Sequence, residues 1–528
     1  MQYTSPPPPV SLRLLCVLCA VYLLTGLLDH DLWKYEDAVH LGVAWDMASN
    51  GHWLHPQLAG QPWGDGPLYY WLAAALGKLL GGLLGFHNAA RLATAVFGAI
   101  TLYALGRSAA LTPSEQRNGQ AQAFNVAAPL LLICAPGLLL PIHDAQPMIA
   151  VLAGHALAYW GMARLAQQSA DGMLPGTALL LTGLLIAALA GGFGALLPPV
   201  GLLLLPLLAA QWRSRQALQG MTIAAVLTAI LLFGFASLLP LSSPAPLHFA
   251  PDRKHLELLA WYAWPALPIG LWALWLHRRQ PGLIALPLAG SISALIWFLL
   301  GSEARNLPAL PLLVPLTLLA ASGASRLRRG AANALDWFGM MTFSLLGLFL
   351  WLGQAALQTG TPPKLHKNIT RLIPGYDNDI SILAWIFAAL ISVIWLLIIV
   401  MGRRTPWRSS RNWACGMVLI WCLSAALWIP AVDYGKRFSA MNHQIAAKVG
   451  TLVKGQCVAG IGLENAQRAA LHYHTGIITR SGKAAQQCDW LLVQGQPRRA
   501  PQVEAGWTKV WDGARPSDRE DRYYLYRR

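Results

Sequence analysis

Residues 33–71 read WKYEDAVHLGVAWDMASNGHWLHPQLAGQPWGDGPLYYW and follow the first long apolar run of the chain. This stretch combines polar side chains, aromatic residues and glycines, whereas most of the surrounding sequence is apolar. Its carboxylates and imidazoles are Glu36, Asp37, Asp46, Asp65, His40, His52 and His55. We therefore expect the chemistry of the protein in this loop, beside a membrane.

The composition predicts a polytopic α-helical membrane protein. Of 528 residues, 55% are hydrophobic and only 12% are charged. Repeated apolar runs of about 18–22 residues match the ~30 Å hydrocarbon core of a bilayer. No small-residue cleavage site follows the first run, so we interpret it as an anchor. The net charge of +16 does not indicate a nucleic-acid partner, because most basic clusters lie at the ends of apolar runs.

The order of apolar runs and basic clusters predicts thirteen membrane spans. The apolar runs are 11–29, 67–86, 89–107, 124–142, 147–166, 176–193, 195–211, 220–241, 258–276, 282–300, 306–325, 335–357, 382–402 and 412–431. Basic clusters mark the cytoplasmic ends of spans. With that constraint, run 67–86 begins and ends outside, so we predict a juxtamembrane or re-entrant helix there. The N-terminus is then cytoplasmic, and the loop 30–66 and the C-terminal segment lie outside.

From about Tyr434 the composition changes to that of a small α/β domain, which divides the chain into 1–433 and 434–528. The patterns predict helices over 441–453 and 465–473 and strands over 457–463 and 489–493, with closing strands near Trp511 and in the C-terminal DRYYLYRR. If this segment faces an oxidising compartment, Cys457 and Cys488 can form a disulfide.

Glu36 and His40 lie one helical turn apart if a helix begins near Glu36. A partly desolvated carboxylate has the raised basicity that a general base needs, and the imidazole can orient it. The alternative is that Glu36 and Asp37 only charge the first turn of a surface helix and complement its dipole.

Further candidates occur in the other outer loops. Asp144 lies between two apolar runs, either as a site residue or as the N-cap of the next helix. His143 could join Glu36 or Asp37 in binding a divalent metal, but no cofactor is required by the pattern. The cations suited to phosphate are Arg253, Lys254 and Arg305, which could equally be solvated loop residues.

The first loop resembles that of GT-C glycosyltransferases, closest to the lipid A aminoarabinose transferases and more distantly to the protein O-mannosyltransferases. The matching residues are Ala44, Met47, Gly51, Trp53, Pro56, Leu58, Gly60, the segment 67–71 (PLYYW) and the segment 89–92 (AARL). The resemblance implies spans with juxtamembrane helices and a C-terminal periplasmic domain. It also implies that Glu36 is the catalytic carboxylate, with Asp37 beside it and Asp144 as the acidic residue of the second loop.

The resemblance further implies a substrate and phosphate site at His40, Asp65, Tyr69, Tyr70 and Arg91. Three family features are absent from this sequence. The lysine of the family's KPPLYYW is replaced by Asp65, the lysine of LTKGP by Gly191, and the segment ARNLPAL lacks the family's tyrosine. We therefore expect Arg253, Lys254 or Arg305 to supply the phosphate contacts.

These observations predict a glycosyltransferase of the bacterial inner membrane. It would move a sugar from an undecaprenyl-phosphate or related polyprenyl-phosphate carrier to a periplasm-facing acceptor, lipid A or another envelope glycolipid. The expected partners are this donor, a lipid acceptor and membrane lipids, and not nucleic acid. The alternatives are an inactive relative that serves as an assembly or binding subunit, a protein O-glycosyltransferase and a lipid transporter.

Overall fold

The structure is a computed structural model and is predominantly helical. It describes residues 12–33, 35–112, 124–167, 170–243, 249, 251–301, 306–402, 405, 407–451, 456–497 and 501–528. Of the predicted site residues, Arg305 lies outside this described part.

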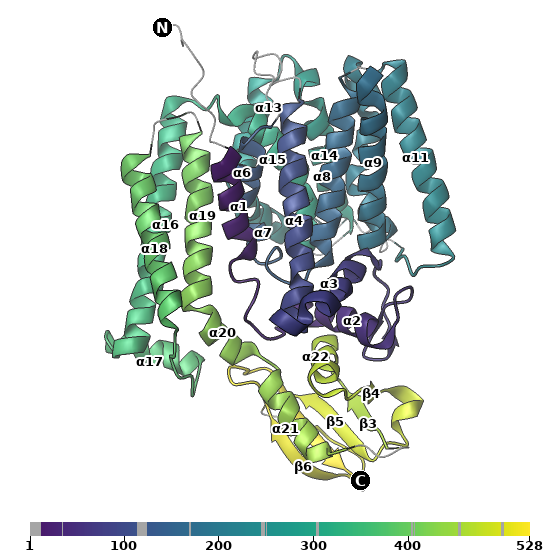
Figure 1. Cartoon of the computed structure of the whole chain (residues 1–528), viewed down its shortest axis with the longest axis vertical. Coiled ribbons are helices and arrows are strands. Elements are labelled where there is room, and N and C mark those ends of the chain that lie inside the picture. The colour runs from purple at the N-terminus through teal and green to yellow at the C-terminus, as the bar shows by residue number, and fades with distance from the viewer. Residues whose placement is uncertain are drawn as a thin grey trace.

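A bundle of long, roughly parallel helices forms the larger part of the molecule (Figure 1). Within the described ranges, eight helices are long and apolar enough to cross a membrane. These are α4 (Phe86–Ala110), α8 (Pro147–Leu165), α9 (Ala170–Gly191), α11 (Arg215–Ala236), α14 (Ala285–Gly301), α15 (Asn306–Ala324), α16 (Arg329–Thr359) and α18 (Ile382–Met401).

Two bent pairs raise this number to ten if each pair is one span. The first joins α12 (Arg253–Tyr262) to α13 (Ala266–Leu276) at 90°. The second joins α19 (Arg408–Leu427) to α20 (Ile429–Lys436) and α21 (Ser439–Val449) at 59°. The predicted number of thirteen spans is therefore not confirmed and stays a prediction.

Besides these bent pairs, three further predicted runs are not long continuous helices in the structure. The first begins the described chain as α1 (Leu12–Leu24). Run 124–142 is divided into α6 (Ala127–Ile133) and α7 (Pro136–Leu139), because Pro136 has no N–H to continue the helical hydrogen bonds. Run 195–211 forms 3-10 turns, Phe193–Leu196, Pro198–Leu204 and Ala210–Trp212, around the short α10 (Leu205–Leu208). Hydrophobicity predicted the length of these runs and not their continuity.

Two helices of the first loop lie across the lower end of the bundle (Figure 1). They are α2 (Glu36–Asn50) and α3 (Leu68–Leu84), and a small hairpin of β1 (Gln57–Leu58) and β2 (Gln61–Pro62) connects them. The position of α3 agrees with the prediction that run 67–86 does not span. The amphipathic helix α17 (Pro363–Leu372) lies at the same end, between α16 and α18.

The C-terminal domain is a five-stranded sheet with helices, below α2 and α3 (Figure 1). Its strand order is β4-β3-β5-β7-β6, parallel from β4 to β5 and antiparallel from β5 to β6. The strands are β3 (Val458–Ile461), β4 (Thr479–Arg480), β5 (Trp490–Gly495), β6 (Thr508–Gly513) and β7 (Arg522–Arg527). The helices are α21 and α22 (Asn465–Thr475), so the predicted elements are confirmed. The disulfide Cys457–Cys488 is present as well.

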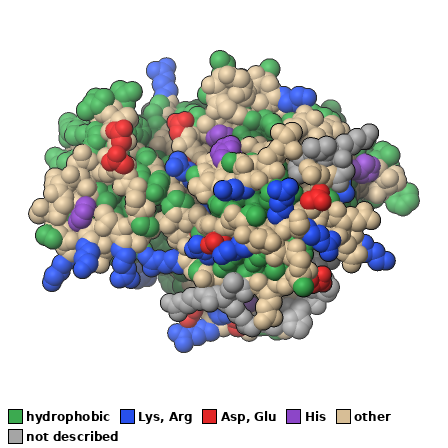
Figure 2. Space-filling model, turned by 90° about the horizontal axis from the view of Figure 1, so that it is seen from below, with side chains coloured by type: hydrophobic (Ala, Val, Ile, Leu, Met, Phe, Trp, Pro, Cys, Tyr) green, Lys and Arg blue, Asp and Glu red, His purple; other side chains and the backbone are tan. Residues whose placement is uncertain are grey.

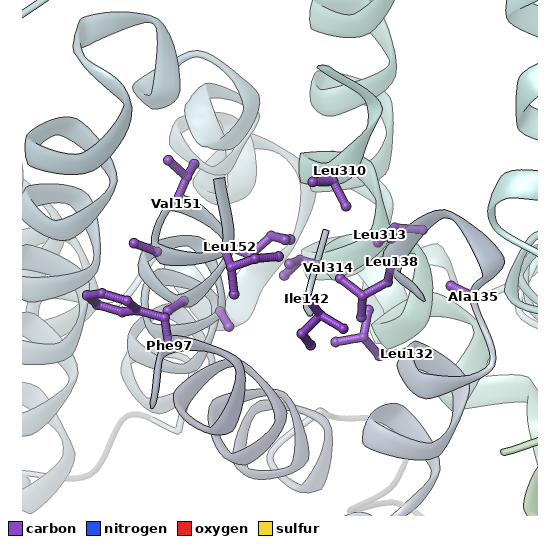
Figure 3. Close-up of a cluster of buried hydrophobic side chains, with 14 of the residues drawn as sticks. Phe97, Leu132, Ala135, Leu138, Ile142, Val151, Leu152, Leu310, Leu313 and Val314 are labelled. Atoms are coloured by element: carbon purple, nitrogen blue, oxygen red, sulfur yellow. The ribbon is translucent and has the colours of Figure 1, made fainter. Parts of the chain in front are cut away.

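A buried apolar core supports the loop that follows α7 (Figure 3). Phe97 of α4, Leu152 of α8 and Leu313 of α15 meet in this core, and Ile142 from the loop inserts among them. Close packing of α8 on α9 depends on glycines, because a Cβ at Gly154 would collide with the backbone of α9. The core therefore holds residues 143–146 in a defined place at the lower end of the bundle.

Candidate active site

A buried ion pair forms the base of the site. Asp37, at the start of α2, and Arg91 of α4 have side-chain exposures of 2% and 0%. The guanidinium Nε donates to Asp37 Oδ1 at 3.0 Å and Nη2 donates to Oδ2 at 2.7 Å. Its remaining donors bond the carbonyl oxygens of His30 and Asp31, both at 2.8 Å, and the side chain of Asn88. The resemblance implied that Arg91 binds phosphate, but all its donors are occupied inside the protein.

The Asp37 carboxylate is equally saturated. It also accepts hydrogen bonds from the backbone N–H of Ala145 at 2.9 Å and of Trp33 at 3.3 Å. Burial alone would raise the pKa of Asp37, but the charge and hydrogen bonds of Arg91 outweigh this and lower it to about 2. Asp37 therefore remains ionised and holds the surrounding loops in position.

A chain of polar side chains connects Glu36 to Asp65. Glu36 is 43% exposed, and its Oε2 lies 3.2 Å from His40 Nε2, as the helical spacing predicted. The other imidazole nitrogen, Nδ1, lies 2.7 Å from the hydroxyl of Tyr70 on α3. That hydroxyl also lies 3.3 Å from Asp65, and Trp63 Nε1 donates to both Asp65 and Tyr70. Glu36 is thus the solvent-exposed end of this relay.

Both tyrosines predicted to contact substrate are buried supports instead. Tyr70 holds His40 and has no exposed surface. Tyr69 is also fully buried, and its hydroxyl lies 2.8 Å from that of Thr94. Thr94 in turn donates to the carbonyl oxygen of Asp144 at 2.8 Å. In the described structure both tyrosines of this pair are therefore engaged with residues around the site.

Asp144 is a carboxylate in the opposite state from Asp37. Its side chain is half-buried, and no hydrogen-bond donor or ion-pair partner reaches it within the described part of the chain. Burial raises its pKa to about 7, and the nearby charges of Asp37 and Glu36 act in the same direction. Arg91 and Lys436 oppose the shift. The alternative role as an N-cap is wrong, because the side chain of Gln146 caps α8 by accepting from Met148 N–H.

The structure gives no support for metal binding by His143. Its two ring nitrogens face the carbonyl oxygens of Leu139 at 2.6 Å and Tyr22 at 2.5 Å, and its ring stacks on Trp421. Neither nitrogen is directed towards Glu36 or Asp37. Among the described residues, no group of three or more His, Cys, Asp or Glu side chains could hold a metal ion.

The loop cations that we expected to contact phosphate are not brought to these residues. Arg253 begins α12, is 89% exposed and pairs with Glu257 at 2.6 Å. Asp252 caps the same helix, and Lys254 follows in its first turn. Neither cation contacts Glu36, His40 or Asp144 in the described structure.

A different cation, Lys436, lies beside the site, and the sequence analysis did not identify it. Its Nζ is 5.7 Å from the centre of the Trp33 ring, and its charge acts on Asp144. Trp33 is held by Asp433, which accepts from the indole Nε1 at 2.8 Å. The available signal was the cluster of Asp433, Lys436 and Arg437 directly after the last apolar run. Nothing in that cluster indicates that it meets a loop 400 residues earlier.

The C-terminal domain closes the remaining side. Asp31 pairs with His474 of α22 at 3.0 Å and accepts from Ser439 N–H at 3.0 Å. Burial would raise the pKa of Asp31, but the bond from His474 and the backbone bonds lower it instead. Tyr473 packs edge-on against Trp45 of α2. The domain is therefore joined to the first loop by polar and aromatic contacts.

Comparison with solved structures gives an independent view of the fold. The chain is similar to the crystal structure of ArnT from Cupriavidus metallidurans bound to undecaprenyl phosphate, with 17% identity, 97% of each chain covered and a TM-score of 0.68. It is similar to ArnT in the apo state with 15% identity, the same coverage and a TM-score of 0.66. The GT-C-like fold implied by the first loop is thereby confirmed. No family profile and no curated protein matches the sequence.

Proposed function

We propose that this chain is a glycosyltransferase that moves a sugar from a polyprenyl-phosphate carrier to an acceptor at the end of the bundle that bears the C-terminal domain. The observation that carries the proposal is the arrangement of Glu36 and Asp144. Glu36 is the solvent-exposed end of a relay, Asp144 receives no hydrogen bond from a described residue, and both lie beside a saturated ion pair. The ArnT-like fold supports the same reaction, because that ArnT structure holds undecaprenyl phosphate.

In the proposed reaction, an acceptor oxygen attacks C1 of the sugar while the bond from C1 to the carrier phosphate breaks. The carrier phosphate leaves with the bonding electrons, and Glu36 takes any proton that the acceptor releases. Because the phosphate is already a good leaving group, the chain mainly needs to position the two substrates and to stabilise charge. Asp144 contributes negative charge on the face where positive charge develops at C1.

The hydrogen-bonded chain from Glu36 to Asp65 offers a path for the proton that Glu36 takes from the acceptor. In the neutral tautomer with its hydrogen on Nδ1, His40 donates to the Tyr70 oxygen, and its free Nε2 faces Glu36 and accepts the proton that Glu36 has taken from the acceptor. The Tyr70 hydroxyl donates to Asp65 throughout, so the proton ends on the imidazole. The carboxylate that replaces the family's lysine would then stabilise the imidazolium, and it would not contact phosphate.

A mainly apolar groove offers a place for the polyprenyl chain. It encloses about 500 Å³ between α8, α9, α11 and the 3-10 turns that follow α9, with Phe193, Met221 and Phe233 among its walls. The turn that contains Asp65 touches the end of α9, because a Cβ at Gly66 would collide with the Leu189 carbonyl. The groove and the site thus share the same end of α9.

Mass spectrometry of envelope glycolipids, with and without this gene, tests the proposal. Loss of a mass increment of one sugar on deletion is expected, and the increment identifies both sugar and acceptor. Complementation by the wild-type gene or by Glu257→Gln should restore the increment, whereas Glu36→Gln should not. An unchanged lipid A fraction with a lost sugar on envelope proteins would indicate a protein acceptor. An unchanged envelope would contradict the transferase and favour the inactive relative.

A further inference from the structure

A second cavity lies between the last helix of the bundle and the C-terminal domain. It encloses about 510 Å³ and is bordered by the end of α17, by α20 and by the loop 515–520. Its apolar side includes Leu372, Ile373 and Val432, and its polar side includes Lys436, Ser517 and Arg519. The α20 helix and the loop are in direct contact, because Ser517 N–H donates to the Gly435 carbonyl at 3.2 Å.

The positive charges in this cavity are only partly compensated by carboxylates among the described residues. Arg515 donates to Asp518 through Nε at 3.0 Å and through Nη2, so these two charges compensate each other. Glu520 lies exposed at the rim. Lys436 is exposed and has no ion-pair partner within the described ranges, and Arg519 donates to the Arg371 carbonyl at 2.9 Å.

One polar group in the cavity has no partner inside the protein. The Ser517 hydroxyl is buried and makes no hydrogen bond to any described residue. A buried hydroxyl without a partner is unfavourable, and groups of this kind are usually satisfied by a ligand or by water. Together with Lys436 and Arg519 it offers donors to an anion.

The cavity is next to a helix suited to the membrane surface. Because α17 connects the two candidate spans α16 and α18, it lies where the bundle leaves the membrane (Figure 1). Lys364, Lys367 and Arg371 are spaced along one face of α17, and the helix contains no acidic residue. Amphipathic helices with a basic face lie in the interface and attract anionic lipids. Basic side chains are also spread over the end of the molecule seen in Figure 2.

We infer that this cavity is the acceptor site and that its occupant is a phosphate-bearing lipid head group from the adjacent leaflet. The phosphate lies between Lys436, Ser517 and Arg519, and the lipid lies against Leu372 and Ile373. Lys436 also faces the carboxylate site through Trp33, so an acceptor held by this lysine is beside Asp144. That the bound lipid is the acceptor rests on the proposed transfer reaction. That the cavity binds a phosphate-bearing lipid does not depend on this reaction.

Binding of radiolabelled dioctanoyl phosphatidic acid to the purified chain in a neutral detergent tests the site without turnover. We expect saturable binding by the wild type and about tenfold weaker binding by Lys436→Ala and by Arg519→Ala, with Lys436→Arg close to wild type. The matched control is Lys448→Ala, an exposed lysine of α21 outside the cavity. The thermal denaturation midpoint of each variant shows whether it is folded.

Two competitors define what the site recognises. Dioctanoyl phosphatidylcholine should displace the label poorly, and inorganic phosphate at the same concentration should displace almost none. Equal binding by Lys436→Ala, Lys448→Ala and the wild type would overturn the inference. Displacement by inorganic phosphate as complete as by the lipid would also overturn it, because the ligand would then be free phosphate.

Kinetics separate this inference from the proposed function. In an active chain, Lys436→Ala should raise KM for the lipid acceptor about tenfold and leave KM for the donor unchanged. A rise in donor KM alone would place Lys436 at the carrier phosphate and contradict the acceptor site. A chain that binds phosphatidic acid in the predicted way but transfers no sugar would contradict only the proposed function.

Discussion

Asp37 and Asp144 are two carboxylates of one site, one buried and one half-buried, in opposite states. Asp37 receives a bidentate guanidinium and two backbone N–H groups, and its pKa is lowered to about 2. Asp144 receives no hydrogen bond from a described residue, and its pKa is raised to about 7. The difference shows that burial alone does not decide the charge of a carboxylate. The hydrogen-bond donors that reach the carboxylate decide its charge. Asp37 therefore has a structural role, whereas the Asp144 carboxylate is available to a ligand.

Of the variants suggested by this comparison, Arg91→Ala should have the largest effect on stability. Arg91→Ala leaves Asp37 as a buried charge without its partner, which should destabilise the fold by about 3–5 kcal/mol. We expect a clearly lower denaturation midpoint and poor yield in detergent. Arg253→Ala removes an exposed pair and should change stability by less than about 0.5 kcal/mol. Equal midpoints for the two variants would show that the pair does not hold the first loop.

Glu36 should show the reverse pattern, with activity lost and stability kept. Glu36→Gln keeps the size and exposed position of the side chain but removes its basicity, so kcat should fall about 100-fold. The denaturation midpoint should match that of wild type and of the control Glu257→Gln. A transfer rate unchanged in Glu36→Gln would remove this residue as the base and leave Asp144 as the candidate.

The pH dependence of stability tests the state of Asp144. Because its folded pKa is about 7, above its ordinary value of 3.8, the folded chain holds a proton that the unfolded chain releases between these pH values. Stability conferred by this group therefore decreases as pH rises from about 4 to about 7 and is constant above. Asp144→Asn should remove this decrease and be more stable than wild type at pH 7.5, on the order of 1–3 kcal/mol.

At pH 4.5 the same variant should differ little from wild type, because Asp144 is protonated in the fold. A variant less stable than wild type at pH 7.5 would contradict the absence of a donor to Asp144. Denaturation midpoints at the two pH values are sufficient for the comparison.

The smallest effect concerns the contact between the first loop and the C-terminal domain. The folded pKa of Asp31 is lowered, so its contribution to stability is present above about pH 4 and is lost as pH falls through the folded value. His474→Ala removes the side-chain partner and should cost about 1 kcal/mol at pH 7. Faster proteolysis between α20 and β3 would report the loosened domain. His443→Ala is the control, because among the described residues its side chain has a ring contact to His474 at 5.9 Å and no hydrogen bond or ion pair.

Sequence reasoning was most successful where the relevant contacts are local. The spacing of Glu36 and His40 predicted their contact, because residues four apart lie on one face of a helix. Trp511 and the alternating C-terminal DRYYLYRR predicted the closing strands β6 and β7, again from neighbouring residues. The apolar runs predicted helices, although Pro136 interrupts one of them.

The site itself was only half predictable. Asp37 and Arg91 were both named as site residues, but their ion pair was not predicted, because a motif does not reveal which side chains pair with one another. Tyr70 reaches His40 across 30 positions, and Lys436 reaches Trp33 across about 400. No spacing rule operates over such separations.

By itself the sequence determined a helical membrane protein with a polar first loop and a small α/β domain. It could do so because hydrophobicity, helical spacing and strand alternation are properties of neighbouring residues. Only the tertiary structure decided that Asp37 is paired with a cation, that Asp144 receives no hydrogen bond from a described residue and that Lys436 lies near them. Those outcomes depend on donors from α4, α20 and the turn before α8, which meet only when the chain is folded.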